Sequence, residues 1–186
     1  KYNLDVYIDH NNEPKGIGGG MNFCADRVET EYIMFLHSDF YVTTNWDKAL
    51  LDVFDKYPND KMWVCSHRVE PNMFGNIDSR PGTLILPKET FGAYLIRKKD
   101  WDKIGGNDPL FAPASWEDMD LFLRMLNKNY KFVLTSKSLV WHFGARGSHR
   151  LEENNNQSSE RQRKAERDNQ IKWMSKWGSL PAFDEY

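Results

Sequence analysis

The chain has 186 residues and a net charge of −2 at pH 7, and its hydrophobic content of 40% and aromatic content of 14% predict one folded domain with a real core rather than a disordered chain. The near-balanced charge argues against a general nucleic-acid binder, and no apolar run is long enough to span a membrane. Cys24 and Cys65 show no metal or redox spacing, so they are predicted to be reduced packing residues of a cytoplasmic protein.

Two strands and a glycine-rich turn are predicted at the start of the chain. Residues 4–9 alternate apolar and polar side chains, which is typical of a strand. The glycines of residues 16–20 let the backbone turn sharply or approach something closely, and a helix is expected at residues 21–29. Residues 32–37 form an apolar and aromatic run, which predicts a central strand buried on both faces of an α/β sheet.

The middle of the chain continues this alternation. A helix capped by Asn45 is expected at residues 45–57, followed by a strand at 62–66, a loop at 70–82 and a strand at 92–97. Asp100 is expected to cap a short helix that ends at the glycine pair 105–106. Residues 107–115 hold two prolines and no periodicity, so they are predicted to form a loop.

The strongest helix pattern lies at residues 116–129. Its core-facing stripe is predicted to consist of Met119, Phe122, Leu123 and Leu126. Asp120 and Arg124 are four residues apart, which predicts a surface ion pair worth a few tenths of a kcal/mol. Strands are expected at 131–135 and 139–143, then a polar loop leading into a helix that ends near residues 173–177.

Three polar features stand where function could lie, and each has an ordinary structural alternative. Asp39 follows the predicted central strand, at the end where α/β sheets bind ligands, although Ser-Asp is also common in turns. Ser115 and Asp118 match a helix capping box, or else the loop delivers Glu117 and Asp118 to a helix start, where one can act as a general base. His142 at a strand end is either a packed or surface residue, or a metal ligand beside Asp39.

Taken in order, these segments resemble family 2 glycosyltransferases. The stretch that leads into the family's Asp-x-Asp motif is matched by Asn22 and by Glu31-Tyr32-Ile33 with Phe35-Leu36-His37-Ser38-Asp39. The acceptor-side segment is matched by Leu95-Ile96-Arg97 through Gly105-Gly106-Asn107-Asp108, the Glu-Asp motif by Glu117-Asp118-Met119-Asp120-Leu121 with Arg124, and the late metal-site histidine by His142.

The resemblance implies a GT-A fold, a Rossmann-like mixed sheet flanked by helices. It implies a nucleotide-sugar-binding half at residues 1–68, an acceptor-binding half at 69–150, and a polar loop with a C-terminal helix at 151–186. It further implies an inverting transfer of a hexosyl-type sugar from a nucleoside-diphosphate donor to a hydroxyl of a glycan or other acceptor, as in polysaccharide biosynthesis.

The resemblance also assigns roles to residues. Asp39 and His142 would hold a Mn²⁺ or Mg²⁺ ion against the diphosphate, and Asp118 would be the base. The donor-binding residues would be Asp9, Asn11, Gly18, Asn22, His37, Ser38 and Arg146. Trp116 and Glu117 would contact the acceptor. Arg146 belongs to a Gly/Ser/Asn-rich stretch at 144–157, which is either a loop that folds over the diphosphate or a plain surface loop.

Two departures from the family pattern keep other functions open. His37 stands where the first Asp of Asp-x-Asp is expected, and the family's first strand and helix are missing upstream of Lys1, so the sequence is expected to be either a fragment or a short domain. The main alternative is therefore a GT-A-like module that binds a nucleotide or glycan without turnover. A metal-dependent nuclease is less well supported, because it would need clustered carboxylates and a basic groove.

Overall fold

A mixed sheet of five strands runs through the described part of the chain, which in this computed structural model comprises residues 16–69, 93–142 and 160–179. The elements are α1 (Gly16–Ala25), β1 (Tyr32–Leu36), β2 (Phe40–Val42), α2 (Trp46–Lys56), β3 (Met62–Val69), β4 (Ala93–Arg97), α3 (Lys98–Ile104), the 3₁₀ helix η3 (Pro109–Phe111), α4 (Glu117–Leu126), β5 (Lys131–His142) and α6 (Glu160–Trp177). The expectations for residues 4–9, 70–82 and 144–157 lie outside the described residues.

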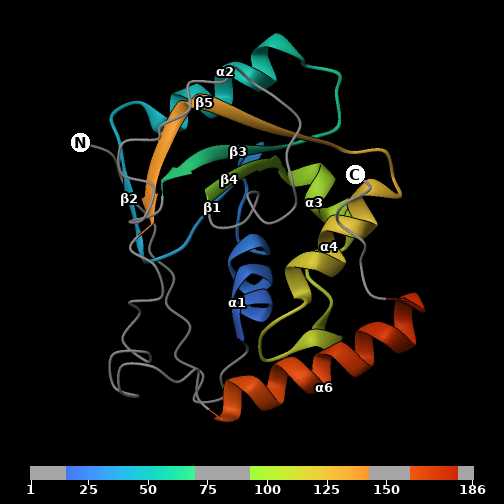
Figure 1. The fold of residues 1–186 in the computed structure, drawn as a ribbon. Coiled ribbons are helices and arrows are strands. Elements are labelled where there is room, and N and C mark those ends of the chain that lie inside the picture. The colour runs from blue at the N-terminus through green and yellow to red at the C-terminus, as the bar shows by residue number, and fades with distance from the viewer. Residues whose placement is uncertain (1–15, 70–92, 143–159, 180–186) are drawn as a thin grey trace.

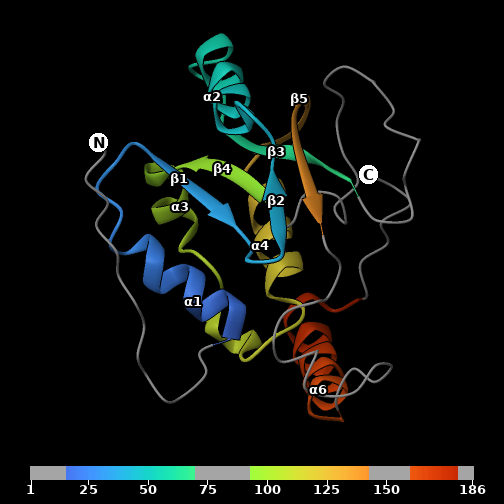
Figure 2. The same cartoon turned by 90° about the vertical axis from the view of Figure 1, so that its left-hand side faces the viewer.

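Helices cover both faces of this sheet (Figure 1). The strand order is β1-β4-β3-β5-β2, in which β3 and β5 are parallel and the other pairs are antiparallel. α2 lies on one face, α1, α3 and α4 lie on the other, and α6 lies beyond α1 and α4 (Figures 1 and 2). The predicted α/β class, a mixed sheet flanked by helices, is therefore confirmed.

The period-two pattern of the strands divides the core into two clusters. Successive side chains of a strand point to opposite faces, so Trp63 of β3 packs toward α3 and α4 while Met62 and Val64 pack against α2. The larger cluster includes Ile33, Phe35, Trp63, Tyr94, Ile96, Trp101, Leu121, Phe122, Met125 and Phe132, and the smaller one consists of Leu50, Phe54, Met62, Val64 and Leu95. Burying each large apolar side chain contributes about 1.5–3 kcal/mol, which gives this sheet its stability.

The strand β1 was expected at the centre of the sheet, but it lies at one end of the described strand order and pairs with β4 alone there. Its apolar run has a different cause. Ile33 and Phe35 face the larger cluster, while Tyr32 and Met34 pack against the smaller one. Both faces of β1 are therefore covered by side chains, which explains why its sequence looks like that of a central strand.

The glycine-rich segment is helical rather than a turn, so α1 begins five residues earlier than predicted. The expected close approach is nevertheless present inside the helix. Gly18 is buried, and a Cβ atom added there would lie 3.0 Å from Cβ of Asn107 and 3.3 Å from Cγ of Glu117. The glycine therefore lets α1 pack directly against the segments that precede and begin α4.

The predicted helix caps are wrong in detail. Asn45 is the N-cap residue of α2, but it has a left-handed backbone (φ 60°) and makes no side-chain cap bond. Asp100 lies inside α3 and accepts a 2.9 Å hydrogen bond from the Tyr130 hydroxyl. The N-cap residue of α4 is Trp116 rather than Ser115, and it too makes no side-chain cap bond. Local spacing thus identified the helices but not the partners of their polar side chains.

The predicted stripe of α4 is displaced, because this helix is covered on two sides. Phe122 is buried as expected, but Met119, Leu123 and Leu126 are only partly buried. The buried residues are Glu117, Asp120, Leu121, Phe122 and Met125. The sheet covers one side of α4, and contacts from the end of α6 cover Asp120, so the predicted surface ion pair with Arg124 is buried at its Asp120 end.

Two further expectations need correction. The strands expected at 131–135 and 139–143 are one strand, β5, whose register to β3 shifts between Ser66 and His67 and so accommodates the intervening residues. Of the two free cysteines, Cys65 is buried as predicted, whereas Cys24 is exposed. Among the described helices, none combines the length and apolar character that crossing a bilayer requires.

Candidate functional site

The candidate residues gather at the edge of the sheet where β1, β3 and β5 end. These strands run in the same direction, because β3 and β5 are parallel and β4 is antiparallel to both β1 and β3. Their carboxyl ends therefore share one edge, which is where α/β sheets bind ligands. The chain leaves β1 at this edge through residues 37–39 and enters β2, whose Phe40 is paired with His142 of β5.

Asp39 and His142 face each other across this edge, as the sequence predicted for a shared site. Nε2 of His142 lies 3.2 Å from Oδ2 of Asp39, and the two side chains are 21% and 22% exposed. The ring of Phe40 stacks on the imidazole with 4.8 Å between centroids and 22° between planes. The imidazole is thus held in a defined orientation while both groups remain reachable from solvent.

The separation of these two atoms fits a shared divalent ion. Octahedral metal–ligand bonds of about 2.1 Å at right angles put two donor atoms about 3 Å apart, close to the distance observed. Within the described residues, no group of three or more His, Cys, Asp or Glu side chains could hold a metal. Two protein ligands suit an ion that is completed by water and substrate phosphates rather than a closed structural site.

His37 lies near both this pair and the carboxylates of α4. It lines a cavity of about 60 Å³ together with Glu117, Asp118 and Tyr94. Burial lowers the pKa of His37, as do the neighbouring His142 and Arg68, while Asp39 partly opposes this shift. His37 is therefore neutral near pH 7 and can offer one donor and one acceptor to a ligand. Its neighbour Ser38 is exposed.

Glu117 and Asp118 open α4 in a poorly hydrated setting. Burial, and secondarily the charge of Asp118, raise the pKa of Glu117 to about 7. Burial also raises the pKa of Asp118, against which its hydrogen bond from the Met119 amide (2.8 Å) acts. Such an environment is typical of carboxylates that exchange protons with a ligand.

Tyr94 is a residue of this site that the sequence did not reveal. It is 2% exposed, and neither its hydroxyl nor Oε2 of Glu117 has a hydrogen-bond partner among the described residues. Both residues line the same small cavity, which is large enough for a water molecule or the end of a ligand. A tyrosine within an apolar strand run looks like an ordinary core residue, so no sequence signal distinguished it.

The segment before α4 has an unusual backbone. Ser115 and Trp116 have backbone φ values of 74° and 75°, which residues other than glycine rarely adopt. The Trp116 ring packs on Trp173 of α6 with 5.2 Å between centroids. Trp116, predicted to contact an acceptor, is thus half-buried against α6 and immediately precedes the candidate carboxylates.

The predicted donor residues Gly18 and Asn22 lie on α1, facing the same region. Nδ2 of Asn22 donates to the Asn107 carbonyl (2.8 Å), and the Asn107 amide donates to Oδ1 of Asn22 (2.9 Å). Gly18 lines a second cavity of about 320 Å³ that also reaches Glu117. The side-chain amide of Asn22 is therefore used to fix α1 to the backbone of Asn107 in the acceptor-side loop. Asp9, Asn11 and Arg146 lie outside the described residues.

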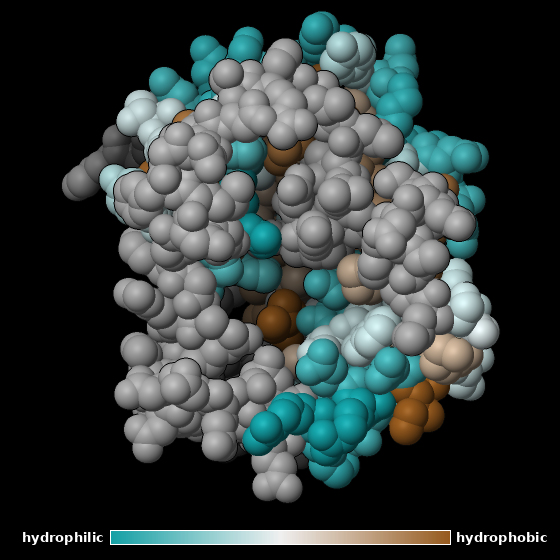
Figure 3. Space-filling model, in the orientation of Figure 1, coloured by the Kyte–Doolittle hydropathy of each residue, from teal (hydrophilic) through white to brown (hydrophobic). Residues whose placement is uncertain are grey.

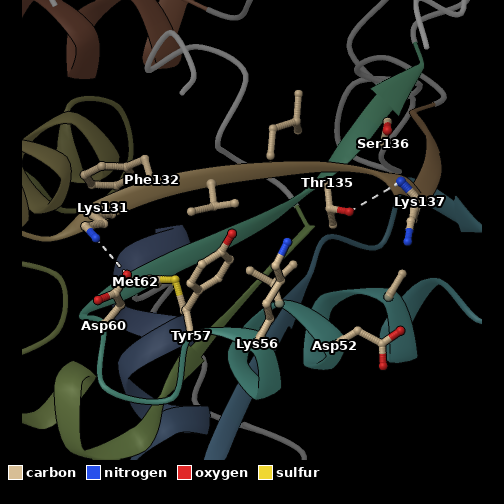
Figure 4. Close-up of a pocket in the computed structure, with 14 residues that line it drawn as sticks. Asp52, Lys56, Tyr57, Asp60, Met62, Lys131, Phe132, Thr135, Ser136 and Lys137 are labelled. Carbon is tan, nitrogen blue, oxygen red and sulfur yellow. Dashed lines mark hydrogen bonds and ion pairs between the residues drawn. The ribbon is translucent and has the colours of Figure 1, made fainter. Parts of the chain in front are cut away.

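A third cavity, of about 670 Å³ and larger than the two above, lies elsewhere among the described residues. It occupies the α2 face of the sheet between α2 and β5 (Figure 4). Lys131 of β5 forms a 2.7 Å ion pair with Asp60 at one end. None of the residues that line it is among the candidate site residues, so size alone does not identify the chemistry here.

Comparison with known proteins adds an independent line of evidence. The family model described as "Glycosyl transferase family 2" matches residues 1–117, more than half of the chain. No curated protein matches. Among solved structures, "Crystal structure of GalNAc-T7 with UDP, GalNAc and Mn2+" is similar with a TM-score of 0.56 and 12% identity, over 72% of this chain but only 31% of that chain. At this identity the similarity shows a shared fold.

Proposed function

Because the chain belongs to glycosyl transferase family 2, we propose that it moves a hexosyl-type sugar from a nucleoside-diphosphate donor to an acceptor hydroxyl, with inversion. The observation that carries the proposal is the arrangement at one sheet edge. A carboxylate–imidazole pair, Asp39 and His142, lies beside a poorly hydrated carboxylate pair, Glu117 and Asp118, and His37 is close to both.

Asp39 and His142 would hold a divalent ion, Mn²⁺ or Mg²⁺, and the similar structure was solved with UDP and Mn²⁺. The ion would supply charge neutralisation for the leaving diphosphate. His37 and Ser38 on the same segment would contact the donor. The chemistry of the donor set supports this assignment, since carboxylate and imidazole are common ligands of Mn²⁺.

Asp118 would act as the base. The acceptor oxygen would form a bond to the anomeric carbon while the bond from that carbon to the diphosphate oxygen breaks. The hydroxyl proton would pass to Asp118, and the nucleoside diphosphate would leave with the bonding electrons. A base in such a displacement must lie within about 3 Å of the hydroxyl. Asp118 lines the same cavity as Tyr94 and Glu117, each of which has a buried oxygen without a hydrogen-bond partner among the described residues.

Glu117 and Tyr94 would receive the acceptor. Both residues line the same cavity as Asp118 and each has a buried oxygen without a hydrogen-bond partner among the described residues, so an acceptor hydroxyl or its bound water could satisfy these groups. Trp116 at the entrance to α4 would contribute an aromatic contact to a sugar.

The test is a screen of nucleotide sugars with the purified chain and Mn²⁺, measuring release of nucleoside diphosphate with and without glycan acceptors. We expect release from one donor class, its increase by acceptor, and its loss with a chelator. Ion-dependent binding of a nucleotide without any release would favour a non-catalytic module, and absence of both binding and release would contradict the proposal.

A further inference from the structure

Asn169 of α6 is almost completely buried, although it lies in a polar stretch. It is 1% exposed, and its Nδ2 atom lies within hydrogen-bond distance of three backbone carbonyls, those of Phe111 (2.6 Å), Ala114 (2.8 Å) and Ser115 (3.0 Å). Its Oδ1 atom accepts a 2.8 Å bond from Lys172, which also donates to the Leu110 carbonyl. The side-chain amide of Asn169 thus holds three backbone carbonyls of the loop that precedes α4 close together.

This loop contains the two left-handed residues that direct α4. Such conformations cost on the order of 1 kcal/mol or more each for residues other than glycine, and they persist where surrounding contacts fix them. Asn169 contacts the carbonyls of Ala114 and Ser115, which lie in the peptide groups before and after Ser115, and Trp173 packs on the ring of Trp116. α6 therefore contacts Ala114, Ser115 and Trp116, the three residues that lead into Glu117.

A second set of contacts anchors α4 itself. Lys176 forms ion pairs with Asp108 (2.7 Å) and Asp120 (2.5 Å), and the Trp177 indole donates to Oδ1 of Asp120 (3.0 Å). The lower part of Figure 3 is mainly hydrophilic with a smaller hydrophobic patch, and the exposed apolar side chains of α6 include Ile171 and Met174. The inward side of this helix carries the contacts, and they converge on the residues just before and just after Glu117 and Asp118.

We propose that α6 is part of the catalytic unit and that Asn169 is a positioning residue. It holds the 111–116 turn in the one conformation that presents Asp118 to the acceptor hydroxyl. The inference rests on the proposed function, because positioning matters to a rate only if the chain transfers a sugar. Asn169 is buried and acts through the backbone of the turn.

The test compares two variants of neighbouring residues. One replaces an amide by a carboxylate, and the other replaces a carboxylate by an amide. Asn169→Asp keeps the size of the side chain but removes the donor and brings a carboxylate toward three carbonyls. Asp168→Asn is the matched control, because the Asp168 side chain is 48% exposed and its ion pair among the contacts described is with Lys164 on the same helix. Each variant is assayed for transfer, for nucleoside-diphosphate binding with Mn²⁺, and for amide hydrogen exchange in residues 112–119.

We expect Asn169→Asp to lower kcat by about tenfold to a hundredfold, to leave nucleotide binding unchanged because Asp39 and His142 lie on other elements, and to accelerate exchange in residues 112–119. Asp168→Asn should change none of these. If Asn169→Asp does not fold, Asn169→Ala removes the donor without adding a charge and is read in the same way.

The exchange measurement needs no activity, so the two proposals fail separately. A parent chain that transfers no sugar contradicts the proposed function, and accelerated exchange in the variant would still support the positioning of the turn. Parent-like turnover in Asn169→Asp contradicts the positioning role, as does unchanged exchange.

Discussion

Arg124 donates a 2.7 Å hydrogen bond from Nε to Oδ2 of Asp120, a carboxylate whose side chain has no exposed surface. The same guanidinium donates from Nη1 to the Ile104 carbonyl (2.9 Å) and from Nη2 to the Gly106 carbonyl (2.6 Å). Because the remaining oxygen of Asp120 meets Lys176 and Trp177, the buried charge is fully partnered. The pair joins α4 to the end of α3 and to α6.

Removing this carboxylate should therefore be costly. Asp120→Ala leaves two cations without their buried partner, and we expect a loss of about 3–5 kcal/mol in the free energy of unfolding, measured by urea denaturation. The control is Asp102→Ala, which breaks the more exposed Lys98–Asp102 pair (2.6 Å) and should cost less than about 1 kcal/mol. Equal losses in the two variants would contradict the buried network.

Asp39 should be needed for ion-dependent nucleotide binding. We expect Asp39→Ala to abolish the calorimetric signal for a nucleoside diphosphate with Mn²⁺, and His142→Ala to weaken the affinity at least tenfold, because each removes one of two proposed protein ligands. Asp55→Ala on the exposed side of α2 is the control. Unchanged ion-dependent affinity in Asp39→Ala would remove the metal assignment.

Asp118, rather than its neighbour, should be the base. Asp118→Asn keeps the shape of the side chain and can still accept the bond from the Met119 amide, so we expect turnover to fall at least about a hundredfold while nucleotide binding is retained. Stability should not fall, because burial already disfavours the charged form. Glu117→Gln is the comparison, and a larger loss of turnover there would transfer the role to Glu117.

Glu117 should make stability depend on pH. Its pKa rises from 4.5 in the unfolded chain to about 7 in the folded chain, so the folded state binds the extra proton between these values. The contribution of Glu117 to the free energy of unfolding is complete below pH 4.5 and is lost as the pH rises to about 7. The total loss is about 3 kcal/mol at most. Denaturation at pH 5 and pH 8 should show Glu117→Gln losing less stability than the parent over this range. Identical pH dependence would contradict the buried carboxyl.

The hydroxyl of Tyr94 should serve a ligand rather than the fold. Tyr94→Phe removes a buried hydroxyl that has no partner among the described residues, so stability should be unchanged or higher, while acceptor-dependent transfer should fall. Tyr130→Phe is the control, because its hydroxyl donates to buried Asp100 and its loss should cost about 1 kcal/mol without a comparable effect on transfer. Stability loss in Tyr94→Phe with normal transfer would reverse the interpretation.

Local patterns of the sequence were sufficient for much of the fold. The apolar periodicity of α2 and α4 and the apolar runs of β1, β3 and β4 predicted these elements, since each depends on residues close in sequence. The proximity of Asp39 and His142 was also predicted, because both end strands of one sheet and the family resemblance pairs them.

The remaining features depend on contacts between distant segments. Asp120 and Arg124 look like a surface pair until α6, about 50 residues later, covers the carboxylate. Asn169 lies in a polar stretch whose sequence gives no sign of burial, and its burial depends on carbonyls of a loop with no periodicity. The caps at Asn45 and Ser115 were expected from local chemistry, but tertiary packing sets the backbone there.

The pairing of β2 has a consequence for how the molecule folds. Among the described strands β2 pairs only with β5, and Asp39 and His142 are 103 residues apart in the chain. β5 itself joins the sheet through parallel pairing with β3, a contact of long sequence separation that slows folding. The carboxylate–imidazole pair therefore cannot form before β5 has docked, so chains still emerging from the ribosome before residue 142 lack it.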